Sequence, residues 1–251
     1  MYKKFIGLSG LPRSGSTLLS SILSQNPNIH AEGNSAVCQM MWDAQCSING
    51  TANQQLIASN RLDTGIELIK NIPNIYYKDI TASTVIDKCR SWTLPDNMAM
   101  LNKYFEHKPK VLVLERPLIE IVKSFVALRQ ANNYQGNLEE ELLDTWSEPI
   151  MRSYEGVKWA KANNNGEFLF VQYNDLINNT KSTIDTIYEF CGLESFEHDF
   201  NNIVNKHPEN DEVYNLIGLH NIRPTINQRQ INIELSQETI KKCKTLDTLA
   251  L

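Results

Sequence analysis

The chain has 251 residues, of which 41% are hydrophobic and 21% are charged, so its apolar content is typical of a globular protein and argues against disorder. The 24 Lys and Arg residues are outnumbered by 29 Asp and Glu residues, which gives a net charge of −5. This balance argues against nucleic acid or a membrane as a partner, because both attract strongly basic surfaces.

Neither the N-terminal segment nor the cysteine pattern indicates export. The apolar run from Phe5 to Leu8 is too short for the core of a signal peptide, and no run of about 18 apolar residues occurs anywhere. The cysteines are odd in number and lack the spacing of zinc ligands. We therefore expect a cytoplasmic protein with free thiols and no metal; the cysteines are Cys38, Cys46, Cys89, Cys191 and Cys243.

Short apolar runs rich in β-branched residues alternate along the chain with the periodicity of amphipathic helices. We predict helices at residues 16–24, after Pro117, and at residues 183–190, where Gly192 is a suitable C-terminal cap. The predicted strands are residues 4–9, 84–86, 111–114 and 168–172. This alternation predicts an α/β fold, in which a parallel β-sheet flanked by helices on both faces binds ligands at the carboxyl ends of its strands. No repeat or linker divides the sequence, so we expect a single domain over residues 1–251.

The first predicted strand runs into a glycine-containing turn, residues 10–17, with the sequence Gly-Leu-Pro-Arg-Ser-Gly-Ser-Thr. Such a turn directs backbone N–H groups and a helix N-terminus at one point, which favours an anion. Arg13 adds forked donors, and Ser14, Ser16 and Thr17 add hydroxyls. The alternative is a plain strand-to-helix turn that needs glycine for its backbone angles. The spacing is that of a nucleoside-triphosphatase loop, but Ser16 stands where such loops carry the lysine that reaches the phosphates.

The loop resembles that of the sulfotransferases that use 3′-phosphoadenosine 5′-phosphosulfate (PAPS). Their pattern is P-[RK]-[ST]-G-[ST]-[ST]-L, and the segment from Pro12 to Leu18 fits every position. The resemblance implies a P-loop nucleoside-triphosphatase-like fold and in-line transfer of a sulfuryl group from PAPS to a hydroxyl or amine acceptor, without a metal. It implies that the 5′-phosphosulfate is bound by Arg13, Ser14, Gly15, Ser16, Thr17 and Leu18.

A second segment resembles the family's 3′-phosphate site. Arg116 ends the predicted strand at residues 111–114, and Ser124 follows it by eight residues, as in the family pattern of R-[DN]-P with a later serine. The resemblance implies that both side chains bind the 3′-phosphate. The sequence departs from the pattern because Pro117 follows Arg116 directly, and the alternative for Arg116 is a surface ion pair.

Three further segments resemble the family less closely. Lys88, after the second predicted strand, matches a lysine that lies beside the bridging oxygen of the sulfuryl group, and we also expect Asp87 to pair with Arg90 and Trp92 to form a wall of the cleft. A solvated charged turn is the alternative for this segment. The resemblance places two more residues at the cofactor, Tyr173 and Arg223, and a core position is the alternative for Tyr173.

The general base and the acceptor are the least determined parts. Glu32 resembles the glutamate base of tyrosine sulfotransferases, and His30 has a suitable ordinary pKa near 6.5, so we predict Glu32 as the base and His30 as its substitute. Residues 36–83 match no motif and are expected to form a mainly helical insertion near the acceptor cleft. We expect the remaining polar-flanked histidines to lie at the surface; they are His107, His198 and His207.

Two rival functions stay open at this point. A nucleotide kinase or another nucleoside-triphosphate enzyme would require Mg²⁺, whereas a non-catalytic nucleotide-binding module would bind the product 3′-phosphoadenosine 5′-phosphate (PAP) without turnover. The sequence indicates neither the acceptor nor the oligomeric state.

Overall fold

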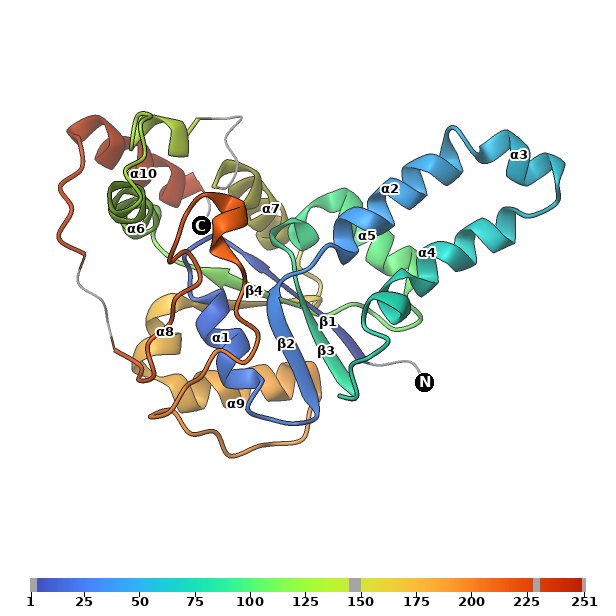
Figure 1. Ribbon diagram of the computed structural model, residues 1–251, viewed down its shortest axis with the longest axis horizontal. Coiled ribbons are helices and arrows are strands. Elements are labelled where there is room, and N and C mark those ends of the chain that lie inside the picture. Colours follow the sequence, from blue (N-terminus) through green and yellow to red (C-terminus); the bar gives the residue numbers. More distant parts are fainter. Residues whose placement is uncertain (1–3, 145–149, 228–230, 250–251) are drawn as a thin grey trace.

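A parallel sheet of five strands forms the centre of the protein (Figure 1). The computed structural model describes residues 4–144, 150–227 and 231–249. The order of the strands across the sheet is β2-β3-β1-β4-β5, and every neighbouring pair is parallel. Their bounds are β1 (Lys4–Gly10), β2 (Ile29–Asn34), β3 (Thr84–Lys88), β4 (Val111–Glu115) and β5 (Phe168–Gln172).

Alternate side chains of the strands pack against helices on opposite faces of the sheet, as the two-residue period of a strand requires. On one face, Ile6 and Leu112 contact a hydrophobic cluster with helices α1 (Ser16–Leu23) and α9 (Thr180–Cys191). On the other, Phe5 and Val111 belong to the larger hydrophobic core. That core includes residues of α5 (Pro95–Tyr104), α6 (Leu118–Ala131), α7 (Met151–Ala162) and α10 (Gln237–Leu249). The expectation of helices on both faces is confirmed.

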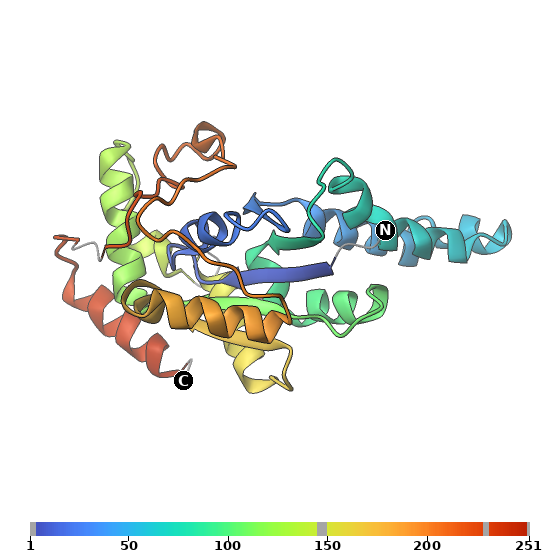
Figure 2. The ribbon, with the colours of Figure 1, turned by 90° about the horizontal axis from the view of Figure 1, so that it is seen from below.

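An arm of three helices projects from the edge of the sheet that carries β2 (Figures 1 and 2). It occupies much of the unmatched region 36–83 and consists of α2 (Val37–Asn49), α3 (Asn53–Ala58) and α4 (Leu62–Tyr76). The remaining regular elements are α8 (Tyr173–Asn178) and the 3-10 turns Arg90–Thr93, Glu140–Leu142 and Asp211–Tyr214. Among the helices of the described ranges, none has the length and apolar character to cross a bilayer.

Four predicted strands are present, and one strand was missed. β2 has the sequence Ile-His-Ala-Glu-Gly-Asn, and only its first three residues are buried. It lies at the edge of the sheet, and its register with β3 shifts between Ala31 and Asn34. An edge strand with polar residues and a glycine lacks the continuous apolar run by which the inner strands were found. The predicted helix after Pro117 begins at Leu118, and Gly192 caps α9 with a φ of 60°.

Candidate active site

The turn between β1 and α1 depends on backbone angles that most residues avoid. Gly10 has a φ of 118°, and a Cβ atom there would lie 2.1 Å from the carbonyl oxygen of Leu114, so only glycine fits. Gly15 has a φ of 93°, and Arg13 adopts a left-handed φ of 57° without being glycine. As a result the chain turns sharply, and α1 begins at Ser16 with its first N–H groups at the mouth of the turn.

A cavity of about 460 Å³ lies at this turn, at the carboxyl ends of β1, β3 and β4. Residues of the segment from Tyr214 to Asn227 also line it, and after the 3-10 turn that ends at Tyr214 this segment contains no helix or strand. Most of the site residues predicted from the sequence line the cavity: Arg13, Gly15, Ser16, Thr17, Leu18, Lys88, Arg116, Ser124, Tyr173 and Arg223.

Three predicted site residues are not among those that line the cavity. Ser14 is completely buried, and its hydroxyl donates a hydrogen bond to the carbonyl of Leu11 inside the turn. Glu32 and His30 lie on β2 and contact each other. None of the arm residues 37–76 lines the cavity either. The arm therefore forms no part of the wall of this cavity.

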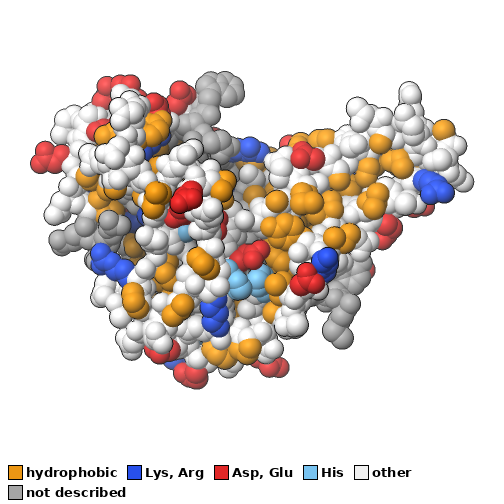
Figure 3. Space-filling model, viewed as in Figure 1, with side chains coloured by type: hydrophobic (Ala, Val, Ile, Leu, Met, Phe, Trp, Pro, Cys, Tyr) orange, Lys and Arg blue, Asp and Glu red, His pale blue; other side chains and the backbone are white. Residues whose placement is uncertain are grey.

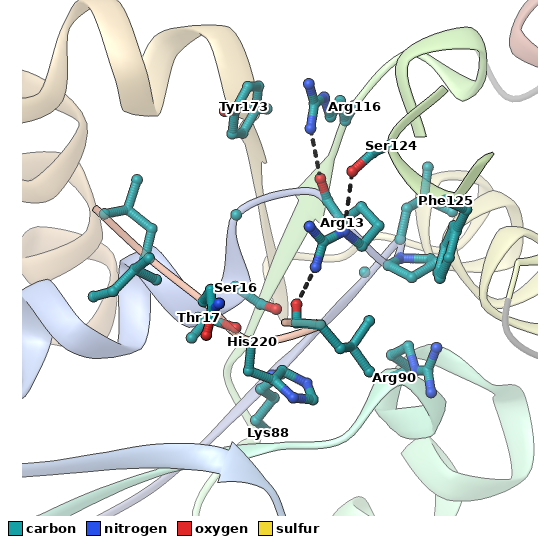
Figure 4. A pocket seen from close by; sticks show the side chains of 18 of the residues that line it. Arg13, Ser16, Thr17, Lys88, Arg90, Arg116, Ser124, Phe125, Tyr173 and His220 are labelled. Carbon is teal, nitrogen blue, oxygen red and sulfur yellow. Dashed lines mark hydrogen bonds between the residues drawn. The ribbon is translucent and has the colours of Figure 1, made fainter. Parts of the chain in front are cut away.

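One end of the cavity carries Arg116, Ser124 and Tyr173, as Figure 4 shows. The Arg116 guanidinium stacks on the Tyr173 ring at 4.1 Å from its centroid and donates to the Arg13 carbonyl at 2.9 Å. Arg13 in turn donates from Nε to the Ser124 hydroxyl at 3.1 Å. Arg116 also pairs with Glu120 at 2.9 Å, but it is only 8% exposed, so it is not a surface ion pair. The two sequence motifs thus meet at Arg13.

Lys88 lies toward the other end of the view in Figure 4, near Arg90 and His220. Its side chain is 6% exposed, and Nζ lies 3.7 Å from a carboxylate oxygen of Glu209. Burial lowers the pKa of Lys88 to about 8, the Glu209 carboxylate opposes this change, and the positive charges of Arg90 and Arg13 add to it. A buried lysine surrounded by further cations is a strong site for negative charge.

His220 is the residue of this site that the sequence analysis missed. Its Nδ1 lies 2.6 Å from Oδ1 of Asp211, and its backbone N–H donates to the other oxygen of the same carboxylate at 3.1 Å. Its Nε2 lies 3.1 Å from Oε2 of Glu209, the partner of Lys88. Burial, followed by the charge of Lys88, lowers the pKa of His220, while Asp211 opposes this change. A neutral imidazole that a carboxylate orients is suited to accept a proton near pH 7.

His220 lies three residues before Arg223, which the sequence analysis placed at the cofactor. No fixed spacing links it to Asp211, Glu209 or Lys88, so no pattern distinguished it from the other histidines. Two of those were expected at the surface but are partly buried. His198 lies 2.9 Å from the Tyr188 hydroxyl, and the ring of His207 lies 4.7 Å from that of His30. His107 is exposed, as expected.

Asp87 and Trp92 have a different role from the one expected. Asp87 is fully buried and accepts hydrogen bonds from the Tyr77 hydroxyl and from Nε1 of Trp92, both at 2.7 Å, and from Ser35. Among the described residues, no ion pair joins Asp87 to Arg90. Trp92 is fully buried in the core and does not line the cavity. Both expectations were wrong because Asp87 and Lys88, as neighbours in a strand, point to opposite faces.

The chain was compared with known protein sequences and structures. A sequence profile described as the sulfotransferase family matches residues 6–198. No curated protein sequence matches significantly. The sulfotransferase domain from the curacin biosynthetic pathway superposes with a TM-score of 0.61 at 14% identity, over 98% of both chains.

Two further solved structures have the same fold. The sulfotransferase domain of the olefin synthase from Synechococcus PCC 7002 gives a TM-score of 0.54 at 17% identity, over 98% of this chain and 96% of that one. A sulfotransferase from Alicyclobacillus acidocaldarius gives 0.52 at 13% identity, over 85% and 88% of the two chains. The profile covers more than half of the sequence and the fold agrees with it, so the chain belongs to the sulfotransferase family.

Proposed function

We propose that the protein transfers the sulfuryl group of PAPS to a hydroxyl or amine acceptor. The observation that carries this proposal is the distribution of positive charge along the cavity. Arg116 lies at one end, the turn with Arg13 lies between, and Lys88 and Arg90 lie at the other end (Figure 4). A donor with a 3′-phosphate and a 5′-phosphosulfate carries two separate negative groups, which such a row of cations would bind.

In this proposal the β1–α1 turn holds the 5′-phosphosulfate. The N–H groups at the start of α1, together with the hydroxyls of Ser16 and Thr17, supply donors to an anion. Arg116 and Ser124 bind the 3′-phosphate, because a guanidinium and a hydroxyl meet there around Arg13. The adenine is expected to lie against the apolar residues of the cavity wall, which include Phe125.

The chemical step joins the acceptor to sulfur and releases PAP. The acceptor oxygen or nitrogen attacks the sulfur, the bond between sulfur and the bridging oxygen breaks, and that oxygen leaves on PAP with the electron pair. Lys88 stabilises the negative charge that develops on the bridging oxygen. The acceptor takes the place of the Glu209 carboxylate beside Nε2 of His220, and this nitrogen accepts the acceptor proton while Asp211 holds the ring through Nδ1. The products are PAP, the sulfated acceptor and a protonated histidine, which then releases its proton to water.

The assignment of the base to His220 rests on position. His220 lines the cavity within reach of the group that Lys88 would contact, whereas Glu32 and His30 do not line it. The sequence-based assignment to Glu32, with His30 as its substitute, stays a prediction that mutation can test against His220.

The proposal is tested first by ligand binding and then by turnover. PAP without metal should raise the unfolding temperature, since a ligand at 100 times its dissociation constant adds about 2.7 kcal/mol to the free energy of unfolding. PAPS with a panel of phenols, alcohols and amines should then release PAP. Stabilisation by ATP with Mg²⁺ but not by PAP would favour the kinase. Stabilisation by PAP without release of PAP from PAPS for any acceptor would favour a binding module.

A further inference from the structure

Three side chains with metal-ligating atoms lie close together outside the cavity, beside the edge strand β2. They are His30, Glu32 and His207, and one ligand atom from each lies within 4.8 Å of the others. Histidine and acidic side chains are also seen together near the middle of the face in Figure 3. The proposed function gives His207 no role, and it assigns the general base to His220 and not to His30 or Glu32. The cluster therefore has no role in the proposed reaction.

The local backbone brings these residues together for clear reasons. His30 and Glu32 are two residues apart on a strand, so their side chains emerge on the same face. His207 arrives from a segment that lies directly on the end of β2. Glu209 in that segment accepts hydrogen bonds from the backbone N–H of Asn34 at 3.1 Å and from its side-chain amide at 3.2 Å. A Cβ atom on Gly33 would lie 2.1 Å from the Glu209 carboxyl carbon, so glycine permits this approach.

One atom of the cluster is buried without a hydrogen bond. His30 is 5% exposed, and its Nε2 has no hydrogen-bond partner among the residues that the structure describes. Nε2 lies 3.1 Å from Oε2 of Glu32, but the two atoms are not aligned for a hydrogen bond. A buried polar nitrogen without a partner is unfavourable. A metal ion that accepts the lone pairs of both atoms would remove this cost.

We propose that His30, Glu32 and His207 bind a zinc ion. Two imidazoles and one carboxylate are a donor set that Zn²⁺ uses with its fourth position open, whereas Mg²⁺ and Ca²⁺ prefer oxygen ligands alone. Ligand atoms around a tetrahedral zinc at bonds of about 2.0–2.1 Å are roughly 3.3 Å apart. The His30–Glu32 pair is already at 3.1 Å. His207 requires a small movement of its side chain to complete the set.

Zinc at this place would fasten the segment from residue 205 to residue 220 to the edge of the sheet. The segment contains only a short 3-10 turn, Asp211–Tyr214, and carries Glu209, Asp211 and His220 to the cavity. Its other attachments near β2 are the Glu209 bonds and a hydrogen bond from Lys206 to the Ser24 carbonyl at 2.8 Å. The ion would therefore act as a structural clamp whose effect does not depend on sulfuryl transfer.

The first test is metal binding by the untagged chain, measured without any cofactor. Zn²⁺ titration calorimetry in a competing weak chelator should give one site per chain, and Co²⁺ should give the visible absorption of a four-coordinate ion. Glu32→Gln and His207→Ala should each weaken binding at least about tenfold, because even outer-shell changes cost 10–100-fold. His107→Ala, at an exposed histidine, should leave binding unchanged. His30→Ala adds a third variant, but it is buried, so the conclusion does not rely on it.

The second test is proteolysis at Lys206, which lies in the fastened segment and is exposed. Zn²⁺ should slow tryptic cleavage after Lys206 in the wild-type chain, but not cleavage after Lys78, which is exposed and lies outside the segment. The protection should be lost in His207→Ala. The proposal is overturned if Zn²⁺ does not bind, if Glu32→Gln and His207→Ala bind it as tightly as the wild type, or if cleavage after Lys206 is unaffected by Zn²⁺. None of these readouts involves PAPS, so they remain informative whether or not the proposed function holds.

Discussion

The two ends of the cavity are built in different ways. The end with Arg116 and Ser124 is formed by the stretches that join β1 to α1 and β4 to α6, together with the first turns of α6, where Ser124 lies. The end with Lys88 combines a strand terminus with Glu209, Asp211 and His220, which lie more than 100 residues later in a segment with little regular structure. The first end depends on local backbone geometry and the second on how a long segment is placed. The Arg116 end should therefore tolerate changes elsewhere in the chain, whereas the Lys88 end should not.

Replacement of His220 is expected to have the largest effect on turnover. His220→Ala should lower kcat by about 10²- to 10⁴-fold, the usual contribution of a general base, while PAP affinity changes little. Glu32→Gln serves as the competing variant. If Glu32→Gln lowers kcat by a comparable factor and its residual rate lacks the acidic limb of the pH–rate profile, while His220→Ala remains active, the base is Glu32 and the assignment to the cavity histidine fails.

Lys88→Ala is expected to lower kcat by about 10²- to 10³-fold, the scale for loss of one preorganised donor at a developing charge. PAP affinity should fall much less, since the proposed contact strengthens as the bridging oxygen becomes negative. Lys78→Ala, at an exposed lysine, is the matched control. Equal losses in PAP affinity and in kcat would mean that Lys88 binds the ground state and does not assist the reaction.

Arg116→Ala tests the other end of the cavity. PAP should bind more weakly by about 1.5–3 kcal/mol, the usual loss for hydrogen bonds to a charged group. A nucleotide without the 3′-phosphate should lose little affinity. Ser124→Ala removes a neutral donor and should give a smaller loss of the same selectivity. Because Arg116 also donates to the Arg13 carbonyl, equal weakening of both nucleotides would show that it supports the turn instead of the 3′-phosphate.

The pH dependence is expected to be the smallest effect, and its direction differs for activity and for stability. The pKa of Lys88 is about 8 in the folded chain and 10.5 ordinarily. Between these values the unfolded chain binds a proton that the folded chain lacks, so the Lys88 contribution to the free energy of unfolding rises with pH. kcat/KM, which reports the protonation state of the free enzyme, should fall over the same window as Lys88 loses its charge. Lys88→Met should lack the stability change, and a wild-type kcat/KM that stays constant from pH 8 to 10 would contradict this role.

Much of the fold could be predicted from the sequence because the inner strands of a parallel sheet are buried on both faces. Their apolar runs, such as residues 111–114, are distinct from the helical patterns between them. β2 was missed because it carries His30, Glu32 and Gly33 in place of such a run, whereas β5, the edge strand on the other side, has one and was found. The arm could not be placed, since the position of α2 and α4 depends on their packing against each other and on the core, which periodicity does not reveal.

The site divides in the same way. The β1–α1 turn was found because its backbone angles require glycines at fixed positions, and the arginine and the hydroxyl residues follow them in a fixed order. Arg116 and Ser124 were found through the fixed interval between the end of β4 and a position in α6. Asp211 and His220 have no such interval with Lys88, because a long segment with little regular structure brings them to the strand end. The same reason hid the proximity of His207 to β2.

The buried Asp87 connects the hydrophobic core to the site, and this connection limits which substitutions the core can accept during sequence divergence. Three donors hold its carboxylate on one face of β3, and this fixes the next side chain, Lys88, on the opposite face. Substitutions of Tyr77 or Trp92 would therefore displace Lys88 without altering any residue of the cavity. In the proposed mechanism this part of the core is constrained by turnover as well as by packing, whereas the arm residues 37–76 do not line the cavity, and buried ones such as Met41 and Ile69 are constrained by packing alone.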